Sequence, residues 1–117
     1  MGCRYQFFDT AEMYGFGVAE IAMGKALKKL GVPRKDYVLS TKLVKCGKGI
    51  NDSMLSRKHI IEGLTASLKR LQEEYVDVVF AHRYDQETPI EEVCRAFNWL
   101  IEHGKAFYWG TSEWTAA

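Results

Sequence analysis

The chain has 117 residues, an ordinary apolar content and a formal net charge of +1. That length allows one domain with a modest core. The near-neutral, interspersed charge gives no electrostatic reason to expect nucleic acid or an anionic membrane surface as a partner. No apolar run approaches the roughly 18 residues of a membrane span, and the charged start and apolar core of a signal peptide are missing. We therefore expect a soluble, cytoplasmic protein without direct membrane insertion.

The cysteines and histidines show no metal-ligand spacing. Cys3, Cys46 and Cys94 are odd in number, far apart and without a Cys-x-x-Cys pair, which argues against a disulfide framework or a zinc site. The histidines are just as scattered along the chain. We predict no metal site.

Hydrophobic periodicity predicts strands and helices in alternation. A short buried strand ends at Asp9, after Phe7 and Phe8. Ser56 is a predicted helix N-cap, and Thr88-Pro89-Ile90-Glu91 predicts a capping box with proline at the first helical position. After the first strand, we predict in chain order a helix over Gly17–Leu30, a strand over Asp36–Lys42, a helix after Ser56 with its buried stripe over Ile60–Leu71, a strand over Asp77–His82, a helix from Pro89 to Gly104 and a strand over Ala106–Gly110.

The predicted order β-α-β-α-β-α-β implies parallel strands with right-handed crossovers. A doubly wound nucleotide-binding sheet is disfavoured, because Gly15-Phe16-Gly17 lacks the third glycine of that fingerprint and begins six residues after Asp9. A (β/α)8 barrel needs about 250 residues. We therefore predict an α/β fold that is a partial (β/α)8 TIM barrel of about four β/α units, either as a fragment of a longer protein or as a truncated gene product.

Polar side chains stand where the predicted strands end. Asp9, Lys42 and His82 each end a strand, Ser112 follows the last one, and Tyr14 comes five residues after Asp9. Parallel α/β folds build their sites at this carboxyl edge. Taken singly, each residue has an ordinary structural explanation, such as a turn acid, a surface lysine or a core histidine. Their recurrence at equivalent strand ends favours a catalytic site.

Asp9-x-x-x-x-Tyr14, Lys42 and His82-Arg83 resemble the aldo-keto reductases, which are NADPH-dependent enzymes on a (β/α)8 barrel. Within that superfamily the sequence is most similar to the voltage-gated potassium channel β-subunits and their plant and microbial relatives. The segments that carry this likeness are Leu55–Ile60, Ser67–Leu71, Glu74–Val79 and Trp109–Trp114. The resemblance spans barrel strands 2 to 5, so residues 1–117 would form an incomplete NADP-dependent oxidoreductase domain.

The resemblance implies a role for each of these residues. Tyr14 would protonate the oxygen of an aldehyde or ketone during hydride transfer from NADPH, and His82 would orient that carbonyl. A lysine ammonium beside a phenol lowers the phenol's pKa, which is the role implied for Lys42, with Asp9 holding the lysine. Asp9, Ser112 and Glu113 would form the cofactor-binding set. Ser112 matches the family residue that hydrogen-bonds the nicotinamide carboxamide. Glu113 stands where many reductases have asparagine and animal channel subunits have arginine.

Three functions stay open at this point. A carbonyl reductase is favoured by His82, because animal channel subunits generally carry asparagine there. A regulatory module that binds NADPH and docks on a potassium channel alpha subunit is favoured by the loop and helix segments, and such relatives form homo-oligomers. The third is an inactive truncated product with open sheet edges.

Tyr84 departs from the family, which usually has proline after His-Arg.

Overall fold

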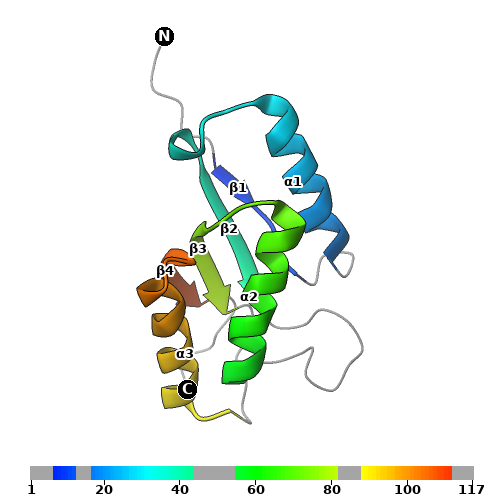
Figure 1. Ribbon diagram of the computed structural model, residues 1–117. Helices are drawn as coiled ribbons and strands as arrows, with labels where there is room; N and C mark the ends of the chain where they lie inside the picture. Colours follow the sequence, from blue (N-terminus) through cyan, green and yellow to red (C-terminus); the bar gives the residue numbers. More distant parts are fainter. Residues whose placement is uncertain (1–6, 13–16, 44–54, 82–87, 112–117) are drawn as a thin grey trace.

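The computed structural model describes residues 7–12, 17–43, 55–81 and 88–111. Within these ranges the chain forms one four-stranded sheet, three α-helices and a short 3₁₀ helix (Figure 1). In chain order the elements are β1 (Phe7–Asp9), α1 (Val18–Leu30), η2 (Arg34–Asp36), β2 (Val38–Leu43), α2 (Arg57–Leu71), β3 (Val76–Ala81), α3 (Ile90–Glu102) and β4 (Ala106–Thr111). The predicted alternation of strands and helices is confirmed.

Neighbouring strands are all parallel, in the order β1-β2-β3-β4. Thr41, Val79 and Trp109 lie side by side in one row across the sheet. The Thr41 hydroxyl donates a hydrogen bond to Glu20 of α1 (2.6 Å), and the Trp109 ring stacks on Phe97 of α3. This row therefore faces the helices, and Figure 1 shows α1, α2 and α3 on the same side of the sheet. Helices outside a parallel sheet are the arrangement of a (β/α) barrel segment.

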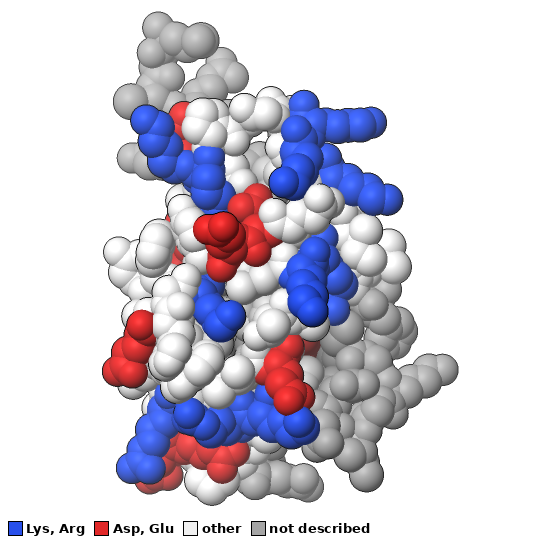
Figure 2. Space-filling model, viewed as in Figure 1, with Lys and Arg blue, Asp and Glu red and all other residues white. Residues whose placement is uncertain are grey.

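The core lies between the sheet and the helices. Its largest fully buried apolar side chains come from β2, α2, β3 and α3 and from the residue before the N-cap of α2: Leu39, Leu43, Leu55, Ile60, Leu64, Leu71, Val76, Val79, Phe97 and Leu100. On the outer side, basic and acidic side chains of the described residues are interspersed (Figure 2). No helix in the described ranges combines the length and apolar character needed to cross a bilayer.

The opposite face of the sheet has no helix over it among the described residues. Phe7 and Tyr108 carry aromatic side chains on that face, and they are 55% and 68% exposed. Side chains alternate along a strand, so Ser40, next to Thr41, points away from the helices, and so does its register partner Asp9. Phe7 is two residues before Asp9, and Tyr108 shares a row with Ser40 and Val78, so both rings lie on this same face. β1 and β4 form the two edges of the described sheet.

Helix ends follow the local sequence. The hydroxyl of Ser56 accepts a hydrogen bond from the backbone N–H of His59 (3.0 Å), so the predicted N-cap of α2 is confirmed. α1 ends at Gly31, whose φ of 64° is left-handed and whose N–H donates to the Leu27 carbonyl. Glycine adopts this conformation without the steric penalty that a side chain would bring.

Several predicted boundaries were wrong by one or two residues. β2 ends at Leu43 rather than at Lys42, β3 begins at Val76 rather than at Asp77, and β4 ends at Thr111 rather than at Gly110. β2 begins at Val38 rather than at Asp36, because Arg34–Asp36 forms η2 directly after Pro33. α3 begins at Ile90, so Pro89 is the N-cap residue rather than the first helical residue. The Pro89 carbonyl accepts the N–H groups of Glu92 and Val93, which is the role of an N-cap carbonyl.

α1 and α2 cross closely. A Cβ atom at Gly24 would lie 2.7 Å from the backbone oxygens of Arg70 and Leu71, so only glycine fits without moving a helix. Beside this crossing, the fully buried carboxylate of Glu20 binds Arg70 Nη2 (2.6 Å) and Nε (2.8 Å). Thr41 of β2 donates to the same carboxylate. This buried ion pair joins two helices to the sheet.

A second charged cluster ties together the amino ends of β2 and β3. The Arg34 guanidinium contacts Asp77 (2.9 Å) and Glu73 (3.3 Å) and lies over the ring of Tyr75, 4.0 Å from its centroid. The hydroxyl of Tyr37 donates to Glu73 Oε1 (2.5 Å). Burial of Tyr37, together with this hydrogen bond to an acid, raises the pKa of the Tyr37 phenol.

The raised pKa of Tyr37 predicts a loss of stability at alkaline pH. An unfolded tyrosine ionises near pH ~10. Above that pH the unfolded chain gives up a proton that the folded chain retains. This one group then lowers the free energy of unfolding by up to about 1.4 kcal/mol per pH unit. Urea unfolding between pH 8 and 11 should show a shallower decline for Tyr37→Phe than for the wild type.

Tyr108→Phe is the matched control, because Tyr108 is exposed. It should keep the slope of the wild type. Equal slopes for Tyr37→Phe and the wild type above pH 10 would contradict the assignment of this effect to Tyr37.

Candidate active site

Asp9 and Lys42 meet at the carboxyl edge of the sheet. Asp9 is the last residue of β1, and Lys42 is the penultimate residue of β2. Lys42 Nζ lies 2.7 Å from Asp9 Oδ2. The Lys42 side chain is 11% exposed and the Asp9 side chain 44%. The ammonium is thus largely enclosed, while its carboxylate partner stays open to solvent.

Ser40 belongs to the same cluster and was missed in the sequence. It lies directly opposite Asp9 in the β1–β2 register, is fully buried, and donates its hydroxyl to Asp9 Oδ1 (2.5 Å). Each carboxylate oxygen of Asp9 therefore has a donor from β2. Side chains alternate along a strand, so Ser40 and Lys42 share a face. That alternation could have identified Ser40 from the sequence.

The segment after β1 continues to follow β2. The backbone N–H of Thr10 donates to the Ser40 carbonyl (3.1 Å), and that of Glu12 donates to the Lys42 carbonyl (3.1 Å). Lys42 Nζ in turn donates to the Thr10 carbonyl (3.3 Å) and lies 5.9 Å from the centroid of the Phe80 ring on β3. Lys42 is therefore held by its backbone and by its ammonium group.

The other residues predicted for the site lie outside the described residues. These are Tyr14, His82, Ser112 and Glu113. β3 is described up to Ala81 and β4 up to Thr111, so His82 and Ser112 follow immediately in the sequence. Of the predicted set, the structure describes only Asp9 and Lys42, and it brings these two together.

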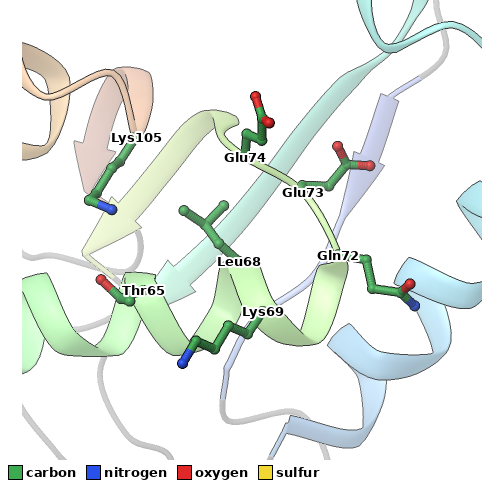
Figure 3. A pocket seen from close by; sticks show the side chains of 7 residues that line it. All are labelled: Thr65, Leu68, Lys69, Gln72, Glu73, Glu74 and Lys105. Carbon is green, nitrogen blue, oxygen red and sulfur yellow. The ribbon is translucent and has the colours of Figure 1, made fainter.

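A hollow in the described part of the chain lies elsewhere. It is a crevice of about 480 Å³ between the end of α2, the turn before β3 and the turn before β4. Figure 3 shows its lining: Thr65, Leu68, Lys69, Gln72, Glu73, Glu74 and Lys105. These turns lead into the amino ends of the strands, so the crevice is at the opposite end of the sheet from Asp9 and Lys42. In barrel enzymes that end serves stability rather than catalysis.

A family model described as the aldo/keto reductase family matches residues 1–117. The chain belongs to the aldo/keto reductase family. The resemblance predicted from the Asp9, Tyr14, Lys42 and His82 positions is thereby confirmed at the level of the family. The family is one of oxidoreductases.

Two plant relatives carry the same name, "Probable voltage-gated potassium channel subunit beta". The one from Oryza sativa subsp. japonica is 62% identical over 110 residues, and the one from Arabidopsis thaliana is 59% identical over 110 residues. In each case the match covers 94% of this chain and 34% of the relative. The chain thus spans about a third of the length of these relatives. The predicted likeness to channel β-subunits is confirmed.

A solved structure supports the fold. Aldo-keto reductase AKR11C1 from Bacillus halodurans, in its holo form, superposes with a TM-score of 0.80 at 35% identity. The match covers 92% of this chain and 36% of that reductase. The predicted partial (β/α) barrel is therefore confirmed.

The Ser40 hydrogen bond predicts a measurable contribution to stability. Ser40→Ala leaves Asp9 Oδ1 without its strand donor. Because Asp9 is partly solvated, we expect the free energy of unfolding to fall by about 1 kcal/mol, below the usual value for a bond to a charged group. Urea unfolding at neutral pH measures this change.

Thr65→Ala is the control for the loss of a hydroxyl. Among the described residues the Thr65 hydroxyl bonds only to the Ile61 carbonyl of its own helix (2.8 Å), so we expect a change below about 0.5 kcal/mol. An unchanged stability in Ser40→Ala would show that the hydroxyl contributes nothing to holding Asp9.

Proposed function

We propose that residues 1–117 are part of an NADP-dependent oxidoreductase domain, and that the complete barrel reduces aldehydes or ketones with NADPH. The observation that carries this proposal is the ion pair of Lys42 with Asp9 (2.7 Å) at the carboxyl edge of parallel strands. A largely enclosed ammonium held beside an open edge is what a tyrosine proton donor needs as its neighbour. Membership of the aldo/keto reductase family supports the same reaction class.

In this proposal Tyr14 is the general acid that gives its proton to the carbonyl oxygen. An ordinary phenol has a pKa near ~10, which is too high for ready proton exchange at neutral pH. The Lys42 ammonium favours the phenolate and so lowers the pKa of Tyr14. Asp9 and the Thr10 carbonyl keep that ammonium in place. His82 orients the carbonyl and shares its proton.

The residues at this edge fit a nicotinamide cofactor. Both oxygens of Asp9 are engaged by β2, yet its side chain is 44% exposed, so the edge presents a fixed polar group to a ligand. Asp9 and Ser112 would hold the nicotinamide end, with Glu113 beside them. When bound, the cofactor supplies the hydride for the carbonyl carbon. The protein supplies position and the proton.

The reaction can be tested in a complete barrel. We define the complete chimera as the rice relative in which residues 1–117 of this chain replace the matching segment. Tyr14→Phe in the complete chimera should lower kcat for aldehyde reduction by about 10²- to 10⁴-fold, because the general acid is lost. The dissociation constant for NADPH should stay within about threefold of the parent value, because the lost proton transfer acts in the transition state and not in ground-state binding. Steady-state kinetics and a fluorescence titration with NADPH measure the two quantities.

Tyr75→Phe is the matched control, because it removes a tyrosine hydroxyl just before β3, at the opposite end of the sheet from Asp9 and Lys42. It should leave kcat unchanged. If Tyr14→Phe turned over aldehyde as fast as the parent chimera, Tyr14 would be removed from the mechanism.

We propose a second role on a separate observation. The plant relatives are named as potassium channel β-subunits at 59% and 62% identity, so the complete protein would dock on a channel alpha subunit as a homo-oligomer. The two roles are compatible, because the substrate edge is formed by strand ends, which leaves the outer helical surfaces available for docking. NADPH at the edge would then report the redox state of the cell to the channel.

A pull-down tests this second role. A tagged rice channel alpha subunit should retain the complete chimera as well as it retains the rice relative, because the chimera keeps two thirds of that relative and this chain matches the rest closely. Retention of the rice relative together with loss of the chimera would exclude channel binding by this chain's surface.

A further inference from the structure

Glu12 and His59 form a buried pair that the proposed mechanism does not use. His59 Nε2 lies 2.6 Å from Glu12 Oε1, and the two side chains are 5% and 1% exposed. Glu12 belongs to the segment after β1, whereas His59 is in the first turn of α2. Ser56 caps the His59 amide (3.0 Å), so the backbone that carries the imidazole is itself fixed.

The neighbouring helix turn leaves room for this pair. Gly63 lies four residues after His59 on α2. A Cβ atom at Gly63 would be 3.2 Å from Glu12 Oε2 and 3.3 Å from His59 Cε1. The carboxylate and the imidazole thus occupy the space that a side chain would otherwise fill. Burying two ionisable groups costs desolvation free energy, which makes such a pair weak evidence for a purely stabilising role.

The Glu12 segment is also the segment that holds Lys42. The Glu12 N–H donates to the Lys42 carbonyl, and the Thr10 carbonyl accepts Lys42 Nζ. The segment of residues 10–12 therefore contacts Lys42 twice, once at its backbone carbonyl and once at its ammonium group. A displacement of Glu12 would disturb both contacts. The described contacts form a continuous path from α2 through Glu12 to the Lys42 ammonium.

We infer that Glu12 and His59 are positioning residues for Lys42: by fastening residues 10–12 to α2, the pair fixes the carbonyl and amide that hold the lysine at the catalytic edge. Its catalytic consequence rests on the proposed function. The pair is separate from the reacting atoms in this scheme, and it acts through the segment that leads towards Tyr14. Glu20 and Arg70 form another pair, with side chains 0% and 19% exposed, but they join helices and touch β2 at Thr41 instead of at Lys42.

The kinetic experiment uses the complete chimera. His59→Leu should lower kcat about 100-fold, because a displacement of about 1 Å in a catalytic group can cost that much. The KM for aldehyde and the dissociation constant for NADPH should stay within about threefold, as expected when only the reacting geometry changes. His59→Gln keeps an N–H donor that can reach the Glu12 carboxylate, so it should recover most of kcat.

Two control variants separate positioning from stability. Glu20→Gln breaks the other buried pair and should lower the melting temperature while kcat per folded molecule stays unchanged. Glu62→Gln breaks the exposed Lys58–Glu62 pair on α2 (2.6 Å) and should change neither quantity. If His59→Leu lowered the melting temperature but left kcat per folded molecule unchanged, as Glu20→Gln is expected to do, the inference would be overturned. Should His59→Leu fail to fold, Glu12→Leu, which also removes the hydrogen bond of the pair, is judged by the same criteria.

Hydrogen exchange provides a readout that is independent of activity. In His59→Leu or Glu12→Leu the amides of residues 10 and 12 should exchange at least about tenfold faster, because their segment opens locally. The same amides in Glu20→Gln and Glu62→Gln should exchange at the parental rate. If neither variant of the Glu12–His59 pair changes these exchange rates, the inference is overturned even if the chimera is an active reductase. An inactive parent chimera defeats the proposed function, and the exchange rates then still decide whether the pair holds the segment.

Discussion

Parallel pairing of β1 with β2 is the constraint on which the candidate site depends. Because both strands run in the same direction, their carboxyl ends come to one edge, and Asp9 meets Lys42 across 2.7 Å. An antiparallel pair would place these two charges at opposite ends of the sheet. The pairing is short, since β1 has three residues. The backbone bonds from Thr10 to Ser40 and from Glu12 to Lys42 extend it past the strand proper.

Buried charges connect this edge to the helical layer. Glu20 binds Arg70 and Thr41, and Glu12 binds His59. Pairs of this kind gain little net stability, because removing two charges from water offsets much of their attraction. What they provide is a defined geometry between elements that apolar packing alone would leave free to slide. In this chain one pair sets how α1 and α2 meet the sheet, and the other sets how the segment after β1 meets α2.

Most of the fold could be predicted from the sequence, because hydrophobic periodicity and glycine or serine at helix ends act locally. The pairing of Asp9 with Lys42 could also be predicted, since it follows from strand order. Ser40 was missed although alternation on β2 points to it. The buried pairs could not be found in this way, because Glu12 and His59 are 47 residues apart and Glu20 and Arg70 are 50 apart. In sequence, such residues look like ordinary surface charges. Tyr14, His82, Ser112 and Glu113 remain predictions, because they lie outside the described residues.

The aromatic face of the sheet has a consequence for biosynthesis. Phe7 and Tyr108 are more than half exposed, and they come from β1 and β4, the two edges of the described sheet. Unpaired edges next to exposed rings recruit other chains. A ribosome adds roughly 5–20 residues each second, whereas collapse of a chain this size takes microseconds. The nascent half-barrel therefore exposes its aromatic face to solvent for as long as translation of any later strands lasts.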